Sequence, residues 1–585
     1  MILDPRLGDA EDDISSPKAR SLAALGVRMF AEISPIKLLF AFAILVVAPA
    51  LTLGLAPIVV GAWFATVSRV VQTVTGLGSL VAIGGSLLLL RYARLPLFRI
   101  LENNFWSLNS ILVQPGYVLF REILRQAVDQ RMPDRDAVGE RDRVRRRNHV
   151  MSLGGALLLC AVCAMVAVAV WGATRWIGAP ADLLRPSRLL LPSLANAVVL
   201  VAVYAAFAAL LAGLADAAMD PARDIAAFDL PRADVRVWRV AHLSDVHVVG
   251  EQFGFRIESG RDGARGNRRF EATLERLAAL HAVEPIDMIL VTGDVTDAGR
   301  STEWAEFLEL TKLYPALAGL LAVAPGNHDV NIVDRANPAR FELPFGAGKR
   351  LRKIRVLSAL DAIQGDRVLV VGAGPSPTMT TLREKLAPHR ARLAKAAVTG
   401  ARKGSMEFDR LWADCFPQIL PPSEKDGLGV LLLDTNAETH FSFTNALGLL
   451  TGRQATAMEA VFRRWPHACW IVALHHHVVE YPGETIPLSM RIGTALINGS
   501  WMVRQLKRQG HRLVVMHGHR HFDWIGHCGP VRIVSAPSSV MNGSKIEDGY
   551  FLLHRLQSAE RRLGVLTPER ISLVNASAAP MAHEV

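Results

Sequence analysis

The chain has 585 residues, of which 51% are hydrophobic, and it carries a formal net charge of +11. This length allows several domains. The apolar excess is concentrated in about the first 215 residues, which argues against a wholly soluble protein. The positive charge allows nucleic acid or anionic lipid as a partner. The five cysteines lack the spacing of a disulfide framework or a zinc finger, which indicates a reducing compartment.

Residues 1–35 have the composition of a polar tail, and the acid-rich part up to residue 20 is expected to be disordered. The first long apolar run begins only near Leu38, so we expect no signal peptide before it.

Residues 36–217 have the composition of a transmembrane region. A run without any charged residue extends from Leu38 to Ser68, and Pro49 and Pro57 interrupt it. One span needs roughly 20 apolar residues, so this run predicts a kinked or tilted helix, with a partly re-entrant segment as the alternative. The expected spans are residues 38–66, 70–90, 150–172 and 193–214.

The loops between these spans predict their orientation, because cytoplasmic loops of membrane proteins carry an excess of Lys and Arg. The loop at residues 91–149 holds 12 Arg against 7 acidic residues, and five of those Arg lie between Arg141 and Arg147. We therefore expect a multi-pass protein of a bacterial inner or cell membrane, with this loop and both ends of the chain in the cytoplasm. The lipid bilayer is the expected partner of the Arg run, and nucleic acid is the weaker candidate.

After the fourth span the pattern changes to alternating strands and helices, over residues 235–556. Helices are expected at residues 268–281, at 301–314 with Ser301 or Thr302 as the N-cap, and at 381–397. Strands are expected at residues 235–243, 288–292, 429–433, 469–474, 513–516 and 531–535, and from Leu321 onward. This alternation predicts an α/β domain with parallel strands.

Two parts of the C-terminal half break the alternation. Residues 331–428 have the composition of a basic insert punctuated by Pro and Gly, and residues 557–585 are expected to be a tail. The run from Lys349 to Lys353 is expected either to contact anionic substrate or lipid head groups, or to be a solvated face of the insert.

Polar clusters follow five of the predicted strands. The turn Gly326-Asn327-His328-Asp329 is one, and the others are Asp245-Val-His247, Gly293-Asp294, His475-His476-His477 and Gly518-His519-Arg520-His521. Any single cluster fits an ordinary turn or a surface histidine. Five at successive strand ends predict one shared site, because α/β sheets bind ligands at the carboxyl ends of their strands.

The residue types in these clusters suit a pair of metal ions. Asp245 and His247 are two residues apart, so in an extended chain both side chains point to one side. Asp294 could bridge two ions, and Asn327 offers a neutral oxygen. Carboxylate and imidazole ligands together suit manganese, iron or zinc better than calcium. Two such ions would lower the pKa of a bridging water and clamp a phosphoryl oxygen, which predicts phosphoester hydrolysis by a metal-bridging hydroxide.

The ordered motifs Asp-x-His, Gly-Asp, Gly-Asn-His-Asp, His and Gly-His-x-His resemble those of the calcineurin-like metallophosphoesterase superfamily, over roughly Val235 to Leu556. Within that superfamily, Leu431-Leu-Leu-Asp434-Thr435 and the following Leu-Leu-Thr-Gly-Arg-Gln454 are most similar to the bacterial class III cyclic nucleotide phosphodiesterase group. The resemblance implies a four-layer αββα sandwich, in which two packed sheets are flanked by helices. Here that sandwich would follow an all-α transmembrane region of about four helices.

The resemblance also implies a role for each motif residue. The two metal ions would be held by the following side chains: Asp245, His247 and His521 at the first, Asn327, His475 and His519 at the second, and Asp294 bridging both. His475 is preferred to His476 because similar sequences use the first histidine of the run. His328 would be the proton donor and a phosphate contact, and not a ligand.

These observations favour a membrane-anchored, cytoplasmic phosphoesterase, most plausibly a phosphodiesterase. The insert, the spans and Val478-Val479, where many relatives have Pro, leave the substrate open. A hydrolase of lipid-linked phosphate or pyrophosphate is the alternative enzyme. A membrane sensor or transporter with a non-catalytic domain is the alternative of another class, although the complete ligand sets argue against it. The oligomeric state is left open by the sequence.

Overall fold

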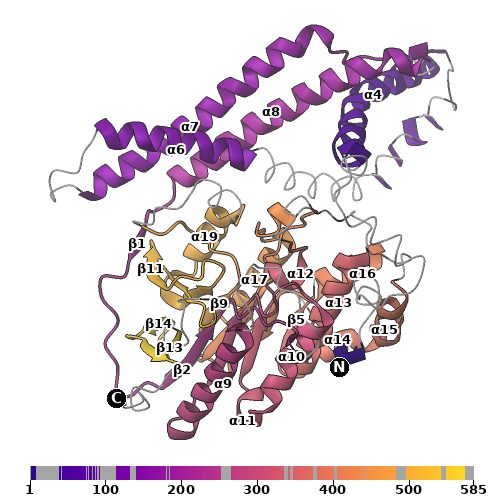
Figure 1. Cartoon of the computed structure of the whole chain (residues 1–585). Helices are drawn as coiled ribbons and strands as arrows, with labels where there is room; N and C mark the ends of the chain where they lie inside the picture. Colours follow the sequence, from indigo (N-terminus) through magenta and orange to yellow (C-terminus); the bar gives the residue numbers. More distant parts are fainter. Residues whose placement is uncertain are drawn as a thin grey trace, which may run out of the picture. The chain divides into compact units, whose positions relative to one another are not determined.

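The computed structural model describes residues 2–7, 42–73, 113–131, 140–179, 185–251, 265–334, 347–372, 378–400, 405–440, 442–482, 496–541 and 549–573, with shorter pieces between them (Figure 1). The chain divides into two compact units, which we describe separately. One unit is Ser34–Met219, and the other combines Met1–Ile33 with Asp220–Val585.

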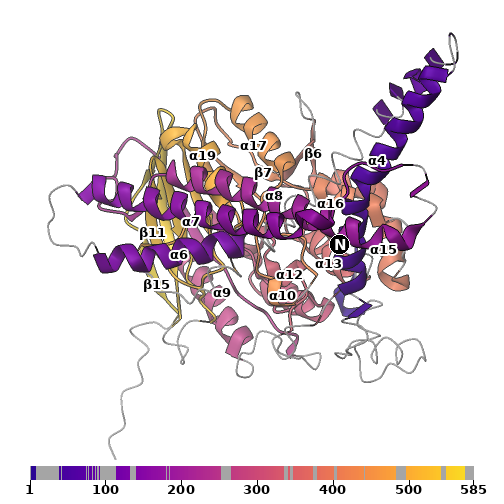
Figure 2. The same ribbon diagram turned by 90° about the horizontal axis from the view of Figure 1, so that it is seen from above.

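The first unit is helical. Its long helices are α4 (Ala48–Thr73), α6 (Gln114–Arg131), α7 (Glu140–Val170) and α8 (Leu190–Ala217). Helices α6, α7 and α8 lie side by side in both views (Figures 1 and 2). At one end of this group, the carboxylate of Asp216 accepts hydrogen bonds from the Tyr117 hydroxyl and the Arg121 guanidinium, each at 2.9 Å. These contacts join α6 to α8.

Three helices of this unit are long and apolar enough to cross a membrane, namely Ala48–Arg69, Arg146–Ala173 and Leu190–Ala217. They coincide with three of the four predicted spans. The predicted span at residues 70–90 is described only in separate short pieces, so the search for spanning helices does not test it. Large apolar side chains are exposed along these helices, which is typical of a surface that contacts lipid. They include Val60, Phe64, Leu157, Met165, Val168, Val203, Phe207 and Leu214.

The second unit contains two sheets. The nine-stranded sheet has the order β1 (Ala222–Asp224), β11 (Trp524–Cys528), β12 (Val531–Ser535), β10 (Leu513–His517), β9 (Cys469–Ala473), β8 (Leu428–Leu432), β7 (Gln418–Leu420), β5 (Leu369–Val371) and β6 (Met379–Thr381). The six-stranded sheet has the order β14 (Arg562–Val565), β13 (Tyr550–Ala559), β2 (Val237–Leu243), β3 (Met288–Thr292) and β4 (Leu321–Ala324), with β15 (Glu569–Ser572) paired to β13.

Strands β2, β3 and β4 are parallel to one another, and so are β8, β9, β10 and β12. Both parallel groups are almost wholly buried, as is expected of parallel strands covered on both faces. One continuous hydrophobic core includes strand residues of both sheets, such as Ile289 and Ile471. The predicted α/β sandwich is therefore confirmed.

Helices flank the two sheets (Figure 1). They are α9 (Arg265–Val283), α10 (Ser301–Lys312), α11 (Pro315–Ala318), α12 (Asn327–Val330), α13 (Ala347–Gln364), α14 (Leu382–Leu386), α15 (Arg390–Thr399), α16 (Ser405–Asp414), α17 (Gly452–Arg464) and α19 (Gly499–Lys507). Helix α10 begins as predicted at Ser301, but its N-cap is Arg300, and neither Ser301 nor Thr302 caps it. The buried Glu303 carboxylate instead accepts hydrogen bonds from the backbone N–H groups of Arg300 and Ala298.

Residues 331–428, predicted to be an insert of the domain, contribute three strands to the nine-stranded sheet and the buried helix α13. The run from Lys349 to Lys353 was expected to contact anionic groups or to be a solvated face, and this expectation is wrong for its last two residues. Arg352 and Lys353 are buried, because Glu342 pairs with Arg352, while Asp409 and Glu438 pair with Lys353.

Elements of the sandwich also lie outside residues 235–556. Strands β14 and β15 lie beyond residue 556, and β1 lies before residue 235. Residues 2–7 were expected to belong to a disordered tail, but they pack against the α/β sandwich through Ser358, which accepts hydrogen bonds from two of their backbone N–H groups. Residues 8–38 lie outside the described part of the chain.

Candidate metal centre

The predicted site residues meet at the carboxyl ends of parallel strands from both sheets. Asp245 follows β2, Asp294 follows β3 and Asn327 follows β4, so the six-stranded sheet supplies three oxygen ligands. His475 follows β9 and His519 follows β10, so the nine-stranded sheet supplies imidazoles. Packing the two sheets face to face therefore assembles the site.

The backbone at these strand ends is unusual. Seven non-glycine residues have positive φ in the described part of the chain, and five of them belong to the predicted ligand set. The five are Asp245, His247, Asp294, His519 and His521, with φ between 48° and 73°. Such conformations cost roughly 1–3 kcal/mol each and persist where the surroundings enforce them. Five such residues in one place indicate a site where the required direction of the side chains is maintained at a cost in backbone conformational energy.

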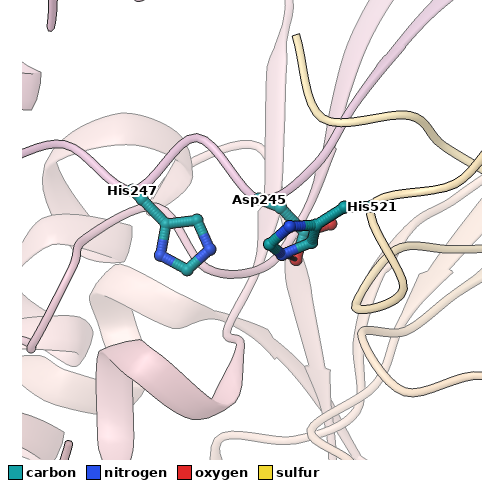
Figure 3. A group of neighbouring side chains, drawn as sticks. All are labelled: Asp245, His247 and His521. Carbon is teal, nitrogen blue, oxygen red and sulfur yellow. Dashed lines mark ion pairs between the residues drawn. The ribbon is translucent and has the colours of Figure 1, made fainter. Parts of the chain in front are cut away.

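Asp245, His247 and His521 form the first candidate ligand group. Their ligand atoms all lie within 4.8 Å of one another. Figure 3 shows Asp245 beside His521, with His247 next to them on the loop that follows β2. The Nε2 atom of His521 is 3.3 Å from an Asp245 carboxylate oxygen. This arrangement brings together the three residues that were predicted to hold the first metal ion.

A second group surrounds Asp294 and His475. The His475 Nε2 atom lies 3.3 Å from Asp294 Oδ2, 3.0 Å from Asn327 Oδ1 and 3.0 Å from His519 Nδ1. The same Asp294 oxygen is 3.8 Å from Nε2 of His247, which belongs to the first group. Asp294 thus faces both ligand groups, as a bridging carboxylate must.

The donor set fits transition-metal ions. The Nε2 atom of His519 is buried and makes no hydrogen bond to any described residue. Leaving a buried polar atom unpaired costs free energy, so such an atom in a cluster of carboxylates and imidazoles calls for a further partner. Mixed nitrogen and oxygen donors of this kind suit manganese, iron or zinc.

The first two histidines of the triplet, His475 and His476, have different environments. His475 faces Asp294 and Asn327, and its Nδ1 atom is 2.8 Å from the carbonyl oxygen of Thr292. A carbonyl can only accept, so Nδ1 carries the proton and Nε2 is free to act as a ligand. The Nδ1 atom of His476 instead lies 2.9 Å from the hydroxyl of Thr435, away from Asp294. The geometry therefore favours His475 over His476 as the ligand.

Charges in the site shift the pKa values of its members. Burial alone lowers the pKa of His475, but the Asp294 and Asp245 carboxylates, with the hydrogen bonds to Asp294 and Thr292, raise it to about 9. Burial alone raises the pKa of Asp245, but His521 and His475 hold it below its usual range. In the absence of a metal ion the site is therefore an ion-paired cluster, in which His475 carries a proton that a metal ion would displace.

His328 has a different environment from the ligand groups. Its backbone N–H donates to Asp294 Oδ1 at 2.8 Å, and its Nδ1 atom is 2.7 Å from the backbone carbonyl oxygen of Asp297. Nδ1 therefore carries a proton, and Nε2 is the atom left for a substrate. The ring is half-buried and stands edge-on to His247, with ring centroids 4.5 Å apart. His247, Asp297 and His328 also form a third group whose ligand atoms lie within 4.8 Å.

Residues that the sequence analysis did not single out hold the catalytic turns in place. Asp329 accepts hydrogen bonds from the Thr296 N–H and hydroxyl, at 2.9 and 2.7 Å, and from the Gly326 N–H at 2.8 Å. It thereby joins the turn after β3 to the turn after β4. Burial and the nearby Asp294 charge raise the pKa of Asp329 to about 6. Asp329 lies inside the predicted Gly-Asn-His-Asp motif, but only the fold shows that it binds backbone groups.

Gly326 shows how closely the two turns approach. A Cβ atom at this position would lie 2.1 Å from the Asp294 backbone nitrogen and 2.2 Å from its Oδ1 atom. Any side chain here would push Asp294 out of its place between the ligand groups. The glycine of the motif is thus required by the close approach of the two turns.

The fold and this centre define a metal-dependent phosphoester hydrolase of the α/β sandwich class. Residues 239–528 match the model of the family described as calcineurin-like phosphoesterase. The matched stretch is therefore a calcineurin-like phosphoesterase domain, and it contains all eight predicted site residues.

Individual relatives are distant. The chain is 28% identical over 104 residues to a protein of Coxiella burnetii named as a probable cyclic nucleotide phosphodiesterase, covering 18% of this chain and 37% of that protein. The chain thus spans little more than a third of the length of this curated relative. Among solved structures, PhoD is similar with a TM-score of 0.32 and 11% identity, over 57% of this chain and 66% of that chain. A purple acid phosphatase from yellow lupin, Lupinus luteus, has a TM-score of 0.27 and 13% identity, over 59% and 55%.

Proposed function

We propose that this protein is a membrane-anchored hydrolase that cleaves a phosphodiester or a related phosphoester with the help of two metal ions. The observation that carries the proposal is the position of Asp294 between two ligand groups, 3.3 Å from His475 and 3.8 Å from His247. A structural ion pair needs only one partner, whereas a carboxylate that faces two separate ligand groups suits a two-metal centre.

Seven side chains would hold the ions. Asp245, His247 and His521 are proposed for the first, Asn327, His475 and His519 for the second, and Asp294 for both. When bound, two such ions supply Lewis acidity that makes water nucleophilic near neutral pH and stabilises charge on phosphoryl oxygens. The identity of the metal is proposed only as far as manganese, iron or zinc, because carboxylate, amide and imidazole donors suit all three.

His328 is proposed to protonate the leaving group. Its Nδ1 proton is held by the Asp297 carbonyl oxygen, so only Nε2 can transfer a proton to a substrate. The Asp297 carbonyl accepts from Nδ1–H and thereby fixes the direction of the ring, with Nε2 on its free side.

Phosphodiesters are the preferred substrate class. The similarity to a named cyclic nucleotide phosphodiesterase supports this choice, although it covers only part of that relative. A lipid-linked phosphate or pyrophosphate is the second candidate. Three helices long and apolar enough to cross a membrane favour it, because they would keep the domain close to substrates in the bilayer.

The membrane region is proposed to anchor the domain in the cytoplasm. The large excess of Arg in residues 91–149 supports this orientation through the positive-inside rule. The net charge of +11 alone would also fit nucleic acid, but much of the basic excess lies between the predicted spans, so we do not propose a nuclease.

A panel of phosphoesters tests this function. The full chain, purified in detergent, would be freed of metal, reloaded with manganese, iron or zinc, and tested on bis-(p-nitrophenyl) phosphate, cyclic nucleotides and lipid-linked pyrophosphates. We expect metal-dependent hydrolysis of a diester, and its loss in Asp294→Asn. If the wild type binds two metal ions but hydrolyses none of these esters, the non-catalytic sensor or transporter becomes the better explanation.

A further inference from the structure

Residues 2–7 lie against the phosphoesterase domain, although more than 200 residues separate them from it in sequence. The Ser358 hydroxyl on α13 accepts hydrogen bonds from the backbone N–H groups of Ile2, at 3.1 Å, and of Leu3, at 2.9 Å. Ser358 itself is buried. The side chains of Ile2 and Leu3 pack against the main hydrophobic core of the domain. This segment is therefore bound by backbone and by apolar contacts.

Helix α10 supplies the second half of the contact. Residues Leu3 to Arg6 and the α10 residues Ala305, Leu308, Glu309 and Lys312 line one shared crevice. Asp4 and Arg6 pair chiefly with each other, and Lys312 and Glu309 of α10 add a weaker attraction of opposite charges. The contact thus combines backbone hydrogen bonds, apolar packing and complementary charge.

This docking constrains how the chain crosses the membrane. The compact unit that contains the domain includes Met1–Ile33 and resumes at Asp220, and β1 pairs with β11 from Ala222 onward. Both points belong to the same compact unit, so they must lie on the same side of any membrane. The number of crossings between them is then even. The described residues supply three helices that could cross, so a further crossing is needed.

We propose that residues 2–7 are an intramolecular tether, which binds the α10 and α13 face of the phosphoesterase domain and keeps the N-terminal segment on the same side of the membrane as the domain. Residues 70–90, predicted from sequence to be a span, supply the fourth crossing. The tether gives the domain a second attachment to the membrane region besides the short link from α8 to β1. The crossing count rests on the proposed membrane anchoring, whereas the docking itself does not.

Cross-linking in membranes tests the docking. In the full chain, Leu3→Cys and Leu308→Cys would be combined, treated with a short bis-maleimide, and the joined peptides identified by mass spectrometry, which separates them from products of the native cysteines. A matched control pairs Leu3→Cys with Leu230→Cys, an exposed position beside β14, at the opposite edge of the six-stranded sheet from β4. We expect at least about tenfold more product from the first pair. Equal yields from both pairs would overturn the tether.

Labelling in sealed vesicles tests the crossing count. Arg6→Cys and Leu313→Cys place thiols at exposed positions on the segment and beyond the end of α10. A membrane-impermeant maleimide should label both in inside-out vesicles and neither in right-side-out vesicles. Labelling in opposite orientations would refute the even count. If alkaline carbonate releases the protein from the membrane, the anchoring fails while the cross-link still tests the docking. If the Leu3→Cys and Leu308→Cys pair gives no cross-link while hydrolysis and membrane anchoring are intact, the tether is refuted and the proposed function is not.

Discussion

The two sheets make unequal contributions to the metal centre. The six-stranded sheet supplies every proposed oxygen ligand, through Asp245, Asp294 and Asn327, whereas the nine-stranded sheet supplies only imidazoles, through His475, His519 and His521. Neither sheet alone presents a complete ligand set. The contrast shows that the six-stranded sheet supplies the carboxylate charge and the bridging ligand. The nine-stranded sheet adds the imidazoles that complete each coordination sphere.

Hydrogen bonds hold the two halves together. The His519 N–H donates to Asp245 Oδ2 at 2.9 Å, and the His475 Nδ1–H donates to the Thr292 carbonyl at 2.8 Å. Each bond joins a loop of the nine-stranded sheet to the six-stranded sheet, at the loop after β2 or at the end of β3. The oxygen-bearing side is also braced internally by Asp329. We therefore expect substitutions on the oxygen side to have the larger effects.

Asp294→Asn should have the largest effect, because it removes the charge that both ligand groups share. We expect occupancy to fall at both metal sites and activity to fall by more than the roughly 10–100-fold typical of residues that only support a ligand. Elemental analysis and hydrolysis of bis-(p-nitrophenyl) phosphate measure the two effects. Asp366→Asn is the control, because that carboxylate is exposed and pairs only with Arg383 among the described contacts. Full two-metal occupancy in Asp294→Asn would remove it from the bridging role.

His328→Ala should separate chemistry from metal binding. Protonating a poor leaving group is worth typically about 10²–10⁴-fold, so the loss on alkyl esters should fall in that range while both metal ions remain. The loss on nitrophenyl esters should be much smaller, because their leaving group barely needs a proton. Equal losses on both ester types would assign His328 to charge stabilisation. A loss of metal would instead make it a ligand, as its proximity to His247 and Asp297 permits.

Asn327→Ala tests whether the oxygen side serves the two ions separately. Its Oδ1 atom lies near His475 in the second group and not in the first. We expect the affinity for the second ion to fall by at least about 10–100-fold, which is the range for residues that only support a ligand, and the first ion to stay bound. Stepwise metal titration measures both affinities. Equal weakening of the two would show that the groups are not independent.

The smallest predicted effect is a pH dependence of metal binding. Without metal, the pKa of His475 is raised to about 9, so at pH 7 this ring is protonated and must lose its proton to bind an ion. Metal affinity should therefore rise with pH between 7 and 9, by up to about tenfold per unit for this one proton. Isothermal titration in buffers of different ionisation enthalpy reports the released proton. An affinity that does not change with pH would mean that His475 is not displaced.

The sequence was sufficient to predict the strand ends that form the site. Long apolar runs indicate the parallel strands. The polar residues that follow them indicate a ligand site, because α/β sheets bind ligands at the carboxyl ends of their strands. The short strands β5, β6 and β7 have three residues each, too few for a pattern. Helix α13 was missed because its buried charges, such as Arg352, resemble a solvated face until their partners are known.

The supporting residues of the site were less predictable than its ligands. Asp329 belongs to the same motif as Asn327, and Asp297 lies three residues after Asp294, but their roles depend on backbone groups brought together by folding. Glu303, in the first turn of α10, accepts a hydrogen bond from the Ala298 N–H and so holds the loop after β3. Its distance in sequence from the ligands does not predict this role. Residues 2–7 include Ile2, Leu3 and Leu7 but are too short a run to predict an element, and their contact with the domain depends on a surface that only the folded domain presents.

The most direct test of the two-metal account is a titration of the metal-free full chain with manganese, in which bound ions per chain and diester hydrolysis are measured in the same samples. The account predicts that two ions bind per chain and that activity follows the occupancy of the second. Full activity with one ion per chain, or in protein stripped of metal, would contradict it.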